Sequence, residues 1–345
     1  MRHYCTYFDS HYASRALALH ASLRRHGHPF KLWALCLDDE VHDFITGLEL
    51  NDVVAFKLVD LEAQFPALSV AKTTRSRIEF YFTCTPFLPA FVFQHEASAE
   101  LVTYLDADLF FYSSIEPLFA EFGDASVGII AHRWPKGREG MVVYGIYNVG
   151  LIIFRRDEHA SKCLAWWGER CLASCCTDPA RGVYGDQKYL DEWPQLFHGV
   201  KVLQHKGGNV GVWNIGNHPV GYQGSTLLIG DEPLVFFHFH GLKRVGSKYF
   251  DLHLVEHEQQ PSGPIFEGIF APYIIALLAI ERRYPWLAAK AVPESEPGKL
   301  AHRLARSLLR NRSPFRLFLK GHYARMFGHR PMVVPRCVAS LLSAA

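Results

Sequence analysis

The sequence shows little sign of the segments that carry a chain into or across a membrane, and we expect none. It has no stretch of roughly 18 or more apolar residues, which is what a membrane-spanning helix needs. Its opening residues, Met1 to Cys5, contain no apolar run of the kind found in a secretory signal. We therefore expect a cytoplasmic protein that works in a reducing compartment.

The sequence also lacks paired Cys-x-x-Cys knuckles. It holds eight cysteines in all. Four of them are close along the chain: Cys163, Cys171, Cys175 and Cys176. In a reducing compartment, the expected state of these side chains is the free thiol. A zinc site is the alternative, although their spacing does not have the paired pattern typical of one.

The sequence also lacks a large excess of positive or negative charge, because its formal net charge is only +2. The whole chain is therefore not expected to bind nucleic acid. Hydrophobic residues make up 49% of the chain and charged residues 20%, which indicates a folded protein with a sizeable core. Its 345 residues allow one large domain or two smaller ones. The high aromatic content of 14% suits a large core and a cleft for a ring-shaped ligand.

Strand-length apolar runs alternate with helical patterns along the chain. The expected strands cover residues 4–8, 31–37, 53–59, 101–105, 127–131, 150–154, 201–203 and 234–239. The expected helices include residues 12–25, 158–173 and 273–283. This alternation predicts an α/β fold with a mixed, mostly parallel sheet flanked by helices and a helical C-terminal extension.

Composition divides the chain into three expected parts: an α/β domain over residues 1–255, a helical extension over residues 256–298 and a basic amphipathic tail over residues 299–345. No acidic residue follows Glu296, while Lys and Arg alternate with Leu and Phe. Such a segment can lie on an anionic membrane surface. A solvated tail is one alternative. Contact with nucleic acid is another, although the low net charge of the whole chain argues against it.

Two carboxylates directly follow the apolar strand at residues 101–105, namely Asp106 and Asp108. In an extended segment, side chains two positions apart point the same way. They would lie at the end of a strand, where open α/β sheets bind ligands. Because two close carboxylates repel each other, we expect a cation between them, and oxygen ligands favour Mg²⁺ or Mn²⁺.

A second polar group ends the expected strand at residues 234–239. His238 could supply a third metal ligand, which would favour Mn²⁺ over Mg²⁺. His240 is an alternative ligand from the same strand face, and either histidine could instead be a hydrogen-bonded core residue. Lys243 could meet a phosphate as a point charge, and Gly241 would let the backbone approach a ligand closely.

Two further polar positions precede strand-like or helical segments. Asn148 could fix sugar hydroxyls by donating and accepting hydrogen bonds, or it could form an Asx turn before the strand at residues 150–154. Asp186 and Gln187 open a helical segment, where Asp186 could face a ligand or act only as an N-cap.

These pieces, in this order, resemble the GT-A glycosyltransferases, and specifically glycosyltransferase family 8, over roughly residues 1–245. The family pattern has four parts, which here read Asp106-Ala107-Asp108, Tyr147-Asn148-Val149-Gly150, Asp186-Gln187-Lys188-Tyr189-Leu190 and His238-Phe239-His240-Gly241-Leu242-Lys243. The opening Thr6-Tyr7-Phe8-Asp9 with Tyr12 is similar to the family's uridine-binding strand and loop. In one departure, Lys243 comes two residues after Gly241, where the family has three. In another, the Pro-Trp that usually follows this lysine is absent.

The resemblance implies a GT-A fold and a metal-dependent transfer of a sugar from a nucleotide-diphosphate sugar, with UDP as the expected nucleotide. It implies that Asp106, Asp108 and His238 hold Mn²⁺ or Mg²⁺ at the donor diphosphate. It implies that Asp186 and Gln187 face the donor sugar and that the anomeric configuration is retained. The remaining expected donor-binding residues are Thr6, Tyr7, Phe8, Tyr12, Lys72, Arg75, Arg77, Asn148 and Lys243.

The acceptor expected from these features is a saccharide or a lipid-linked sugar. Phe82-Thr83-Cys84-Thr85-Pro86 is similar to a segment in bacterial proteins of unassigned function, and a bacterial cell-surface polysaccharide such as lipopolysaccharide is the expected product. The basic tail would then hold the enzyme at the inner face of the membrane. Two alternatives remain: a metal-dependent phosphoryl or nucleotidyl transferase, and a non-catalytic protein that binds nucleotide sugars.

Overall fold

The structure is a computed structural model that describes residues 1–26, 28–245, 249–254, 256–259, 263–291, 323–327 and 330–333. Most of the expected basic tail, residues 299–345, lies outside the described residues, so its contact with a membrane stays a prediction. Two short strands from that region are described, β16 (Tyr323–Phe327) and β17 (Arg330–Val333).

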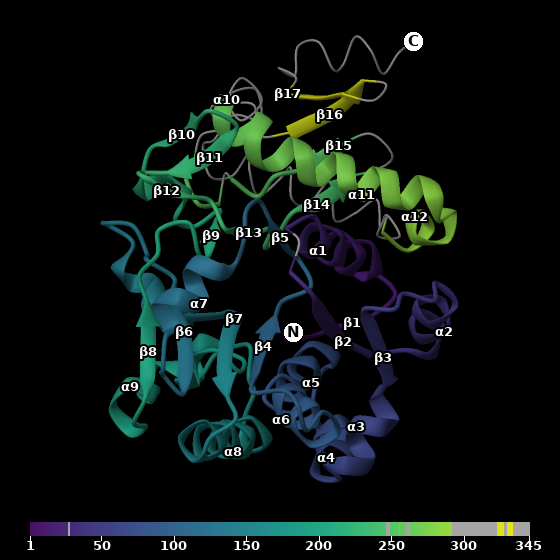
Figure 1. Cartoon of the computed structure of the whole chain (residues 1–345), viewed down its shortest axis with the longest axis vertical. Helices are drawn as coiled ribbons and strands as arrows, with labels where there is room; N and C mark the ends of the chain where they lie inside the picture. The colour runs from purple at the N-terminus through teal and green to yellow at the C-terminus, as the bar shows by residue number, and fades with distance from the viewer. Residues whose placement is uncertain are drawn as a thin grey trace.

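A mixed sheet of seven strands forms the centre of the described chain (Figure 1). Its order is β3-β2-β1-β4-β7-β6-β8. The strands are β1 (Arg2–Phe8), β2 (Phe30–Cys36), β3 (Val53–Lys57), β4 (Leu101–Leu105), β6 (Val127–Ala131), β7 (Tyr147–Arg155) and β8 (Val200–Leu203). All neighbours pair in parallel except β7, which runs antiparallel to both β4 and β6. The expected α/β class with a mixed, mostly parallel sheet is confirmed.

Helices cover both faces of this sheet. The helices before β7 are α1 (Ala13–Arg25), α2 (Asp39–Gly47), α3 (Leu58–Gln64), α4 (Ala67–Thr74), α5 (Arg77–Cys84), α6 (Phe87–His95) and α7 (Glu116–Phe122). After β7 come α8 (Glu158–Ala173) and α9 (Trp193–Leu196). Short helical turns occur at η1 (Glu139–Tyr144), η2 (Pro179–Arg181), η3 (Lys188–Glu192) and η4 (Ile215–Asn217). Two of the longer helices begin at side chains that cap them. Asp157 caps α8, and Ser76 with Glu79 forms a capping box at the start of α5.

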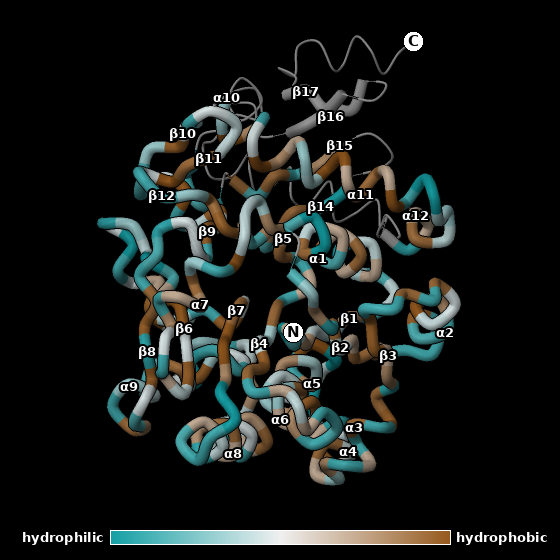
Figure 2. Tube along the Cα trace, viewed as in Figure 1, coloured by the Kyte–Doolittle hydropathy of each residue, from teal (hydrophilic) through white to brown (hydrophobic). Residues whose placement is uncertain are grey.

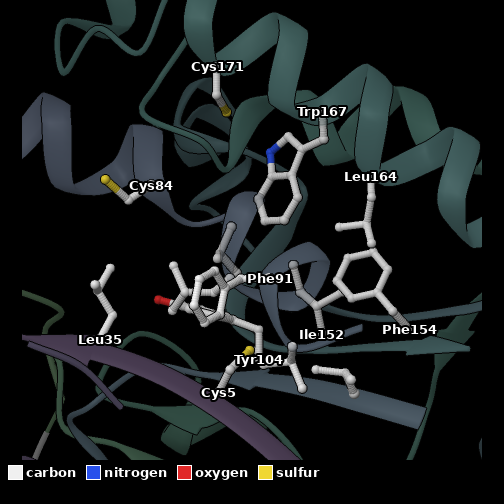
Figure 3. Packing of buried hydrophobic residues seen from close by; sticks show 14 of the residues in the cluster. Cys5, Leu35, Cys84, Phe91, Tyr104, Ile152, Phe154, Leu164, Trp167 and Cys171 are labelled. Carbon is white, nitrogen blue, oxygen red and sulfur yellow. The ribbon is translucent and has the colours of Figure 1, made fainter. Parts of the chain in front are cut away.

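The two faces of the sheet have separate hydrophobic cores. On one face, α1 and α7 pack against the sheet through Leu19, Leu23 and Phe119. On the other, helices α3 to α6 and α8 pack around Tyr104 and Trp167 (Figure 3). Both faces of β7 are thereby covered, and Figure 2 shows hydrophobic residues along this strand. Burial on both faces explains its near-continuous apolar sequence.

Smaller sheets lie beyond the central one. The first has the order β5-β13-β9 and is formed by β5 (Leu109–Phe111), β13 (Phe236–His238) and β9 (Val210–Gly211). The second consists of β10 (Val220–Gln223), β11 (Thr226–Ile229) and β12 (Glu232–Pro233). The third consists of β14 (Lys243–Val245), β15 (Tyr249–Asp251), β16 and β17.

The helical extension follows these sheets and packs across them beside α1 (Figure 1). It contains α10 (Gly263–Ile265), a π-helical turn η5 (Phe266–Phe270), α11 (Ala271–Arg283) and α12 (Pro285–Ala291). The continuous helix over Gly263–Arg283 is long and apolar enough to span a bilayer, with a mean hydropathy of 1.8, which the expectation of no such segment had missed. Phe270, Tyr273 and Leu277 bury one side of it in a core with the smaller sheets. A helix in the core of a folded domain has the same length, composition and one-sided burial, so this helix is not by itself strong evidence for a membrane span.

The seven cysteines in the described residues are all free and buried. The expectation of free thiols is confirmed for them. Within the described chain, the one cluster of side chains suited to hold a metal ion contains no cysteine. The zinc alternative therefore has no support in that part of the chain.

Candidate active site and metal centre

The candidate site lies where the carboxyl ends of β1 and β4 meet in the middle of the sheet. These parallel strands are neighbours in the sheet. After β1, the chain first adds β2 and β3 on one side of β1, and it then returns to add β4 on the other side. Such a reversal of strand order opens a crevice at the carboxyl ends of the strands. Tyr7 and Phe8 end β1 on one side of this point, and Asp106 follows β4 on the other.

Asp106 and Asp108 lie in the tight turn that joins β4 to β5. We had expected them in an extended segment, so that part of the prediction is wrong. The amide of Leu109 donates to the carbonyl of Asp106 (3.2 Å) and closes the turn. The backbone of Asp106 is tied to β7 by its bond to Gly150 O (2.9 Å). The backbone of Asp108 accepts from Phe239 N (3.0 Å), just beyond β13.

His238 is brought to this turn by strand pairing. β13 runs antiparallel to β5, which places His238 opposite Leu109, next to Asp108. Its Nε2 lies 3.1 Å from Asp108 Oδ1 and 3.5 Å from Asp106 Oδ2. One ligand atom from each of the three residues lies within 4.8 Å of the others. The three side chains expected to hold the metal are therefore together.

Asn148 fixes the orientation of the His238 ring. Its Oδ1 lies 3.3 Å from His238 Nδ1, so that Nε2 faces the carboxylates. Its amide nitrogen donates to Gln187 Oε1 (3.1 Å) and also lies 3.1 Å from His132 Nε2. Oδ1 accepts from Gly150 N (3.0 Å) too, so the Asx turn considered above is also present. One amide therefore links the metal cluster to Gln187.

The electrostatics of the cluster indicate a place for a cation. Burial and the neighbouring carboxylate of Asp108 raise the pKa of Asp106. Burial would also raise the pKa of Asp108, but the charge and hydrogen bond of His238 outweigh it and lower that pKa to about 2. Burial would lower the pKa of His238, yet the two carboxylates outweigh it and raise that pKa. The two carboxylates thus favour a positive charge between them, which a bound metal ion would supply.

The donor set fits a divalent metal ion of intermediate hardness. Two carboxylate oxygens and one imidazole nitrogen are ligands that Mn²⁺ accepts readily, whereas Mg²⁺ prefers oxygen alone. The second ring nitrogen of His238 is held by Asn148, an arrangement common for metal-binding histidines. His240 is not in the cluster of three, although its ring lies 6.1 Å from that of His238.

Asp186 and Gln187 lie in the loop that leads into η3. Gln187 is held by Asn148 and by its own bond to Tyr144 O (2.7 Å). Asp186 is buried, and the indole of Trp167 donates to its carbonyl (2.8 Å). Gln187 rather than Asp186 occupies the N-cap position of η3, without a side-chain bond. The alternative reading of Asp186 as a helix cap is therefore wrong.

The buried carboxyl of Asp186 makes stability depend on pH. Burial raises its pKa from 3.8 to about 7, so the folded chain keeps a proton that the unfolded chain loses in that window. The free energy of unfolding contributed by this group therefore falls as pH rises from about 4 to 7, by up to about 1.4 kcal/mol per unit. Asp186→Asn removes the dependence, so its stability relative to the natural chain rises over that range. Urea unfolding of both chains in EDTA measures the difference, and a constant difference would contradict this expectation.

Of the four donor-binding residues expected in and after the first strand, Tyr7 and Tyr12 lie near the metal-site carboxylates, whereas Thr6 and Phe8 are buried. Tyr7 lies among polar groups, since Asp186 and Asp106 both act on its phenol and its ring is 6.1 Å from that of Tyr104. Tyr12 is half-exposed and lies in the electrostatic range of both metal-site carboxylates. Thr6 is fully buried. Phe8 packs in a core against α1 and α2, so contact with a ligand there would come from its backbone.

The three basic residues around α4 and α5 are not all at the site. Lys72 pairs with Glu62 (2.9 Å) and lies over the Phe80 ring. Arg75 donates to Thr83 and to the carbonyl of Leu172, which ties α5 to α8. Arg77 lies near the phenol of Tyr81, whose ring is 6.4 Å from that of Tyr7. The contacts of Lys72 and Arg75 are with helices rather than with the metal cluster, and their role at a diphosphate stays a prediction.

Lys243 is exposed on β14 and acts electrostatically on His240. Two residues near the cluster were missed by the sequence analysis. Tyr104 donates to Asp106 Oδ1 (2.7 Å), and its position two residues earlier on the strand was an available signal. Arg15 acts on Asp108 from α1 and follows Tyr12 by three positions, which places both on one helix face.

Two bacterial proteins are similar to this chain in sequence. No protein-family model matches it. The Bacillus subtilis (strain 168) protein YfnF is 33% identical over 250 residues, which cover 70% of this chain and 82% of the relative. YfnD from the same strain is 29% identical over 302 residues, which cover 85% of this chain and 95% of the relative. Both relatives are described as uncharacterized proteins.

Several solved glycosyltransferase structures are also similar. Apo GlyE of Streptococcus pneumoniae TIGR4 has a TM-score of 0.48 and 16% identity, with 85% of this chain and 64% of that chain covered. Mouse xyloside xylosyltransferase 1 has a TM-score of 0.46 and 18% identity, with 70% and 98% covered. The galactosyltransferase LgtC, in complex with donor and acceptor sugar analogs, has a TM-score of 0.44 and 16% identity, with 69% and 87% covered. At these scores the likeness carries no argument about activity.

Proposed function

The chain belongs to the same family as the Bacillus subtilis protein YfnF, and from its site we propose that it is a metal-dependent glycosyltransferase of the GT-A type. Its donor is a nucleotide-diphosphate sugar, with UDP as the nucleotide, and its acceptor is a saccharide or a lipid-linked sugar. The observation that carries the proposal is the convergence of Asp106, Asp108 and His238 within 4.8 Å at the strand ends. The resemblance of the four motifs to glycosyltransferase family 8 supports it.

In this proposal, each residue of the site has a defined task. Asp106, Asp108 and His238 hold a divalent metal ion, which when bound neutralises charge on the departing diphosphate. Asn148 keeps the His238 ring in the ligating orientation and positions the amide of Gln187. That amide group faces the donor sugar near its anomeric carbon, where retention of configuration is proposed.

The remaining parts of the proposal concern the nucleotide and the location. Tyr7 ends the first strand and Tyr12 follows it, and both phenols lie within electrostatic range of the carboxylates, which suits contact with the nucleotide. We place the enzyme in the cytoplasm of a bacterial cell, at the inner face of the membrane, where it would build a cell-surface polysaccharide. The excess of basic residues after Glu296 supports this location.

Thermal unfolding with nucleoside diphosphates tests the proposal. We expect one of UDP, GDP or ADP to raise the unfolding temperature in the presence of Mn²⁺ and to lose that effect in EDTA. A ligand at about 100 times its Kd stabilises a folded chain by about 2.7 kcal/mol. The matching sugar nucleotide should then release its nucleoside diphosphate slowly in the same buffer.

Other outcomes would assign a different function. Release of orthophosphate or pyrophosphate, instead of a nucleoside diphosphate, would favour a phosphoryl or nucleotidyl transferase. Metal-dependent binding without any turnover, even with acceptor sugars added, would favour a non-catalytic binding protein. Absence of any effect of Mn²⁺ on nucleotide binding would contradict the metal-dependent site itself.

A further inference from the structure

A second polar group adjoins the metal cluster on the side of α1 and α11. It consists of Tyr12, the N-cap residue of α1, with Arg15 on α1 and Tyr273 on α11. Arg15 lies over the Tyr12 ring, and the ring of Tyr273 stacks on Phe239, whose amide donates to the carbonyl of Asp108. These contacts place the group beside the proposed metal site, although 258 positions separate Arg15 from Tyr273 in the sequence. The two phenols and the guanidinium also act electrostatically on one another and on Asp108.

Arg15 is held in place at this position. Its Nη2 donates to the carbonyl of Leu242 (2.8 Å), and its guanidinium lies 4.5 Å from the centroid of the Tyr12 ring. The two carboxylates that act on Arg15 have closer partners of their own, because Asp108 pairs with His238 and Glu281 with Arg244. Arg15 has five N–H donors, and the bond to Leu242 uses one of them. The cation is thus fixed beside the carboxylates without being neutralised by a close ion pair.

Tyr273 contributes a hydroxyl that has no partner in the described part of the chain. The residue is fully buried, with 0% of its surface exposed. Its ring stacks on Phe239 (3.8 Å between centroids) and adjoins Phe110 (5.4 Å). Phe239 directly follows the proposed metal ligand His238, so the phenol is held rigidly next to the cluster. A buried hydroxyl without a hydrogen bond costs about 1–3 kcal/mol, a cost that a ligand with an acceptor oxygen at this position would remove.

We propose that Arg15, Tyr12 and Tyr273 form a subsite for phosphate oxygens, which receives the terminal phosphate of the nucleoside diphosphate released from the donor. The inference rests on the proposed function. A guanidinium and two phenols supply several N–H and O–H donors and one positive charge, which together match a phosphate oxygen cluster. The helical extension therefore contributes directly to the active site through Tyr273.

Binding of UDP and of UMP, each with Mn²⁺, tests the subsite by calorimetry; GDP with GMP and ADP with AMP are run in parallel. Hydrogen bonds to charged groups are worth enough to change affinity by roughly tenfold to hundredfold. We expect Arg15→Gln and Tyr273→Phe each to weaken diphosphate binding in that range and to leave monophosphate binding unchanged. Tyr273→Phe keeps the ring stack, so its unfolding temperature without ligand should not fall.

Two matched controls are available in the described chain. Arg24 lies on the same helix as Arg15 but pairs with Asp52, and Arg24→Gln should bind the diphosphate normally. The Tyr112 hydroxyl donates to the carbonyl of Ile269, so Tyr112→Phe should lower stability and leave diphosphate affinity unchanged.

Three results would overturn the subsite. One is diphosphate binding by both variants equal to that of the natural chain, and another is an equal loss of diphosphate and monophosphate binding. The third is weaker binding of inorganic phosphate with diphosphate binding intact, which would assign the subsite to a phosphate on the acceptor. If instead the natural chain binds no nucleoside diphosphate with Mn²⁺, the proposed function fails, and that result is distinct from the other three.

Discussion

Asp108→Asn is expected to reduce sugar transfer by at least about 10²–10³-fold, because it removes a charged ligand from the centre of the cluster. Asp108 is the carboxylate closest to His238, at 3.1 Å, and its pKa is held at about 2, so it is ionised at any working pH. The asparagine has nearly the same shape but no charge to hold the metal ion. Release of nucleoside diphosphate from the sugar nucleotide with Mn²⁺ measures the effect.

The matched control for this variant is Asp124→Asn. Asp124 is exposed after α7 and is not part of the metal cluster, so its loss of charge should leave turnover unchanged. Circular dichroism establishes that both variants are folded. Full metal-dependent activity in Asp108→Asn would contradict the assignment of this carboxylate to the metal.

Gly150→Ala is expected to weaken Mn²⁺ binding by about 10–100-fold, although Gly150 is itself no ligand. A Cβ at this position would lie 2.6 Å from Asn148 Oδ1 and 2.8 Å from His238 Nδ1, which is closer than such atoms can approach. The methyl group must therefore push apart the bond that orients His238. Loss of a residue that orients a metal ligand has a cost of this size. Calorimetric titration with Mn²⁺ measures it.

Gly221→Ala provides the comparison for this prediction. Gly221 is also a strand glycine, in β10, and a Cβ there would have no atom within 4 Å. Its replacement should leave metal affinity unchanged. Equal Mn²⁺ affinity in Gly150→Ala and the natural chain would mean that the Asn148–His238 contact does not determine the ligand geometry.

The architecture of the sheet could be predicted from the sequence because its strands are short apolar runs between helical patterns. The predicted strand at residues 101–105 and the helix at residues 158–173 match β4 and α8 in both bounds. The prediction of Asp106 and Asp108 as a converging pair was right for a partly wrong reason. A turn, closed by the bond from Leu109 N to Asp106 O, brings them together rather than strand alternation. Turn geometry of this kind depends on the pairing of β5 with β13, which no local pattern records.

Contacts between distant segments account for most of what the sequence did not reveal. Tyr273 reaches the site only because α11 packs beside α1, and no motif connects the two helices. For the basic residues, the sequence suggested a contact that the structure does not show. The pattern around Arg75 suggested a phosphate contact, whereas its guanidinium donates to a carbonyl near the end of α8. Charge alone does not tell a ligand-facing arginine from one that bridges helices.

The central claim is that Asp106, Asp108 and His238 together bind one divalent metal ion. Anomalous diffraction at the manganese edge, from crystals of the full chain grown with MnCl₂ and a nucleoside diphosphate, tests it directly. We predict a single anomalous peak within coordination distance of a carboxylate oxygen from each aspartate and of His238 Nε2, with diphosphate oxygens completing the shell. A nucleotide bound at the ends of β1 and β4 with no manganese between these three side chains would contradict the account.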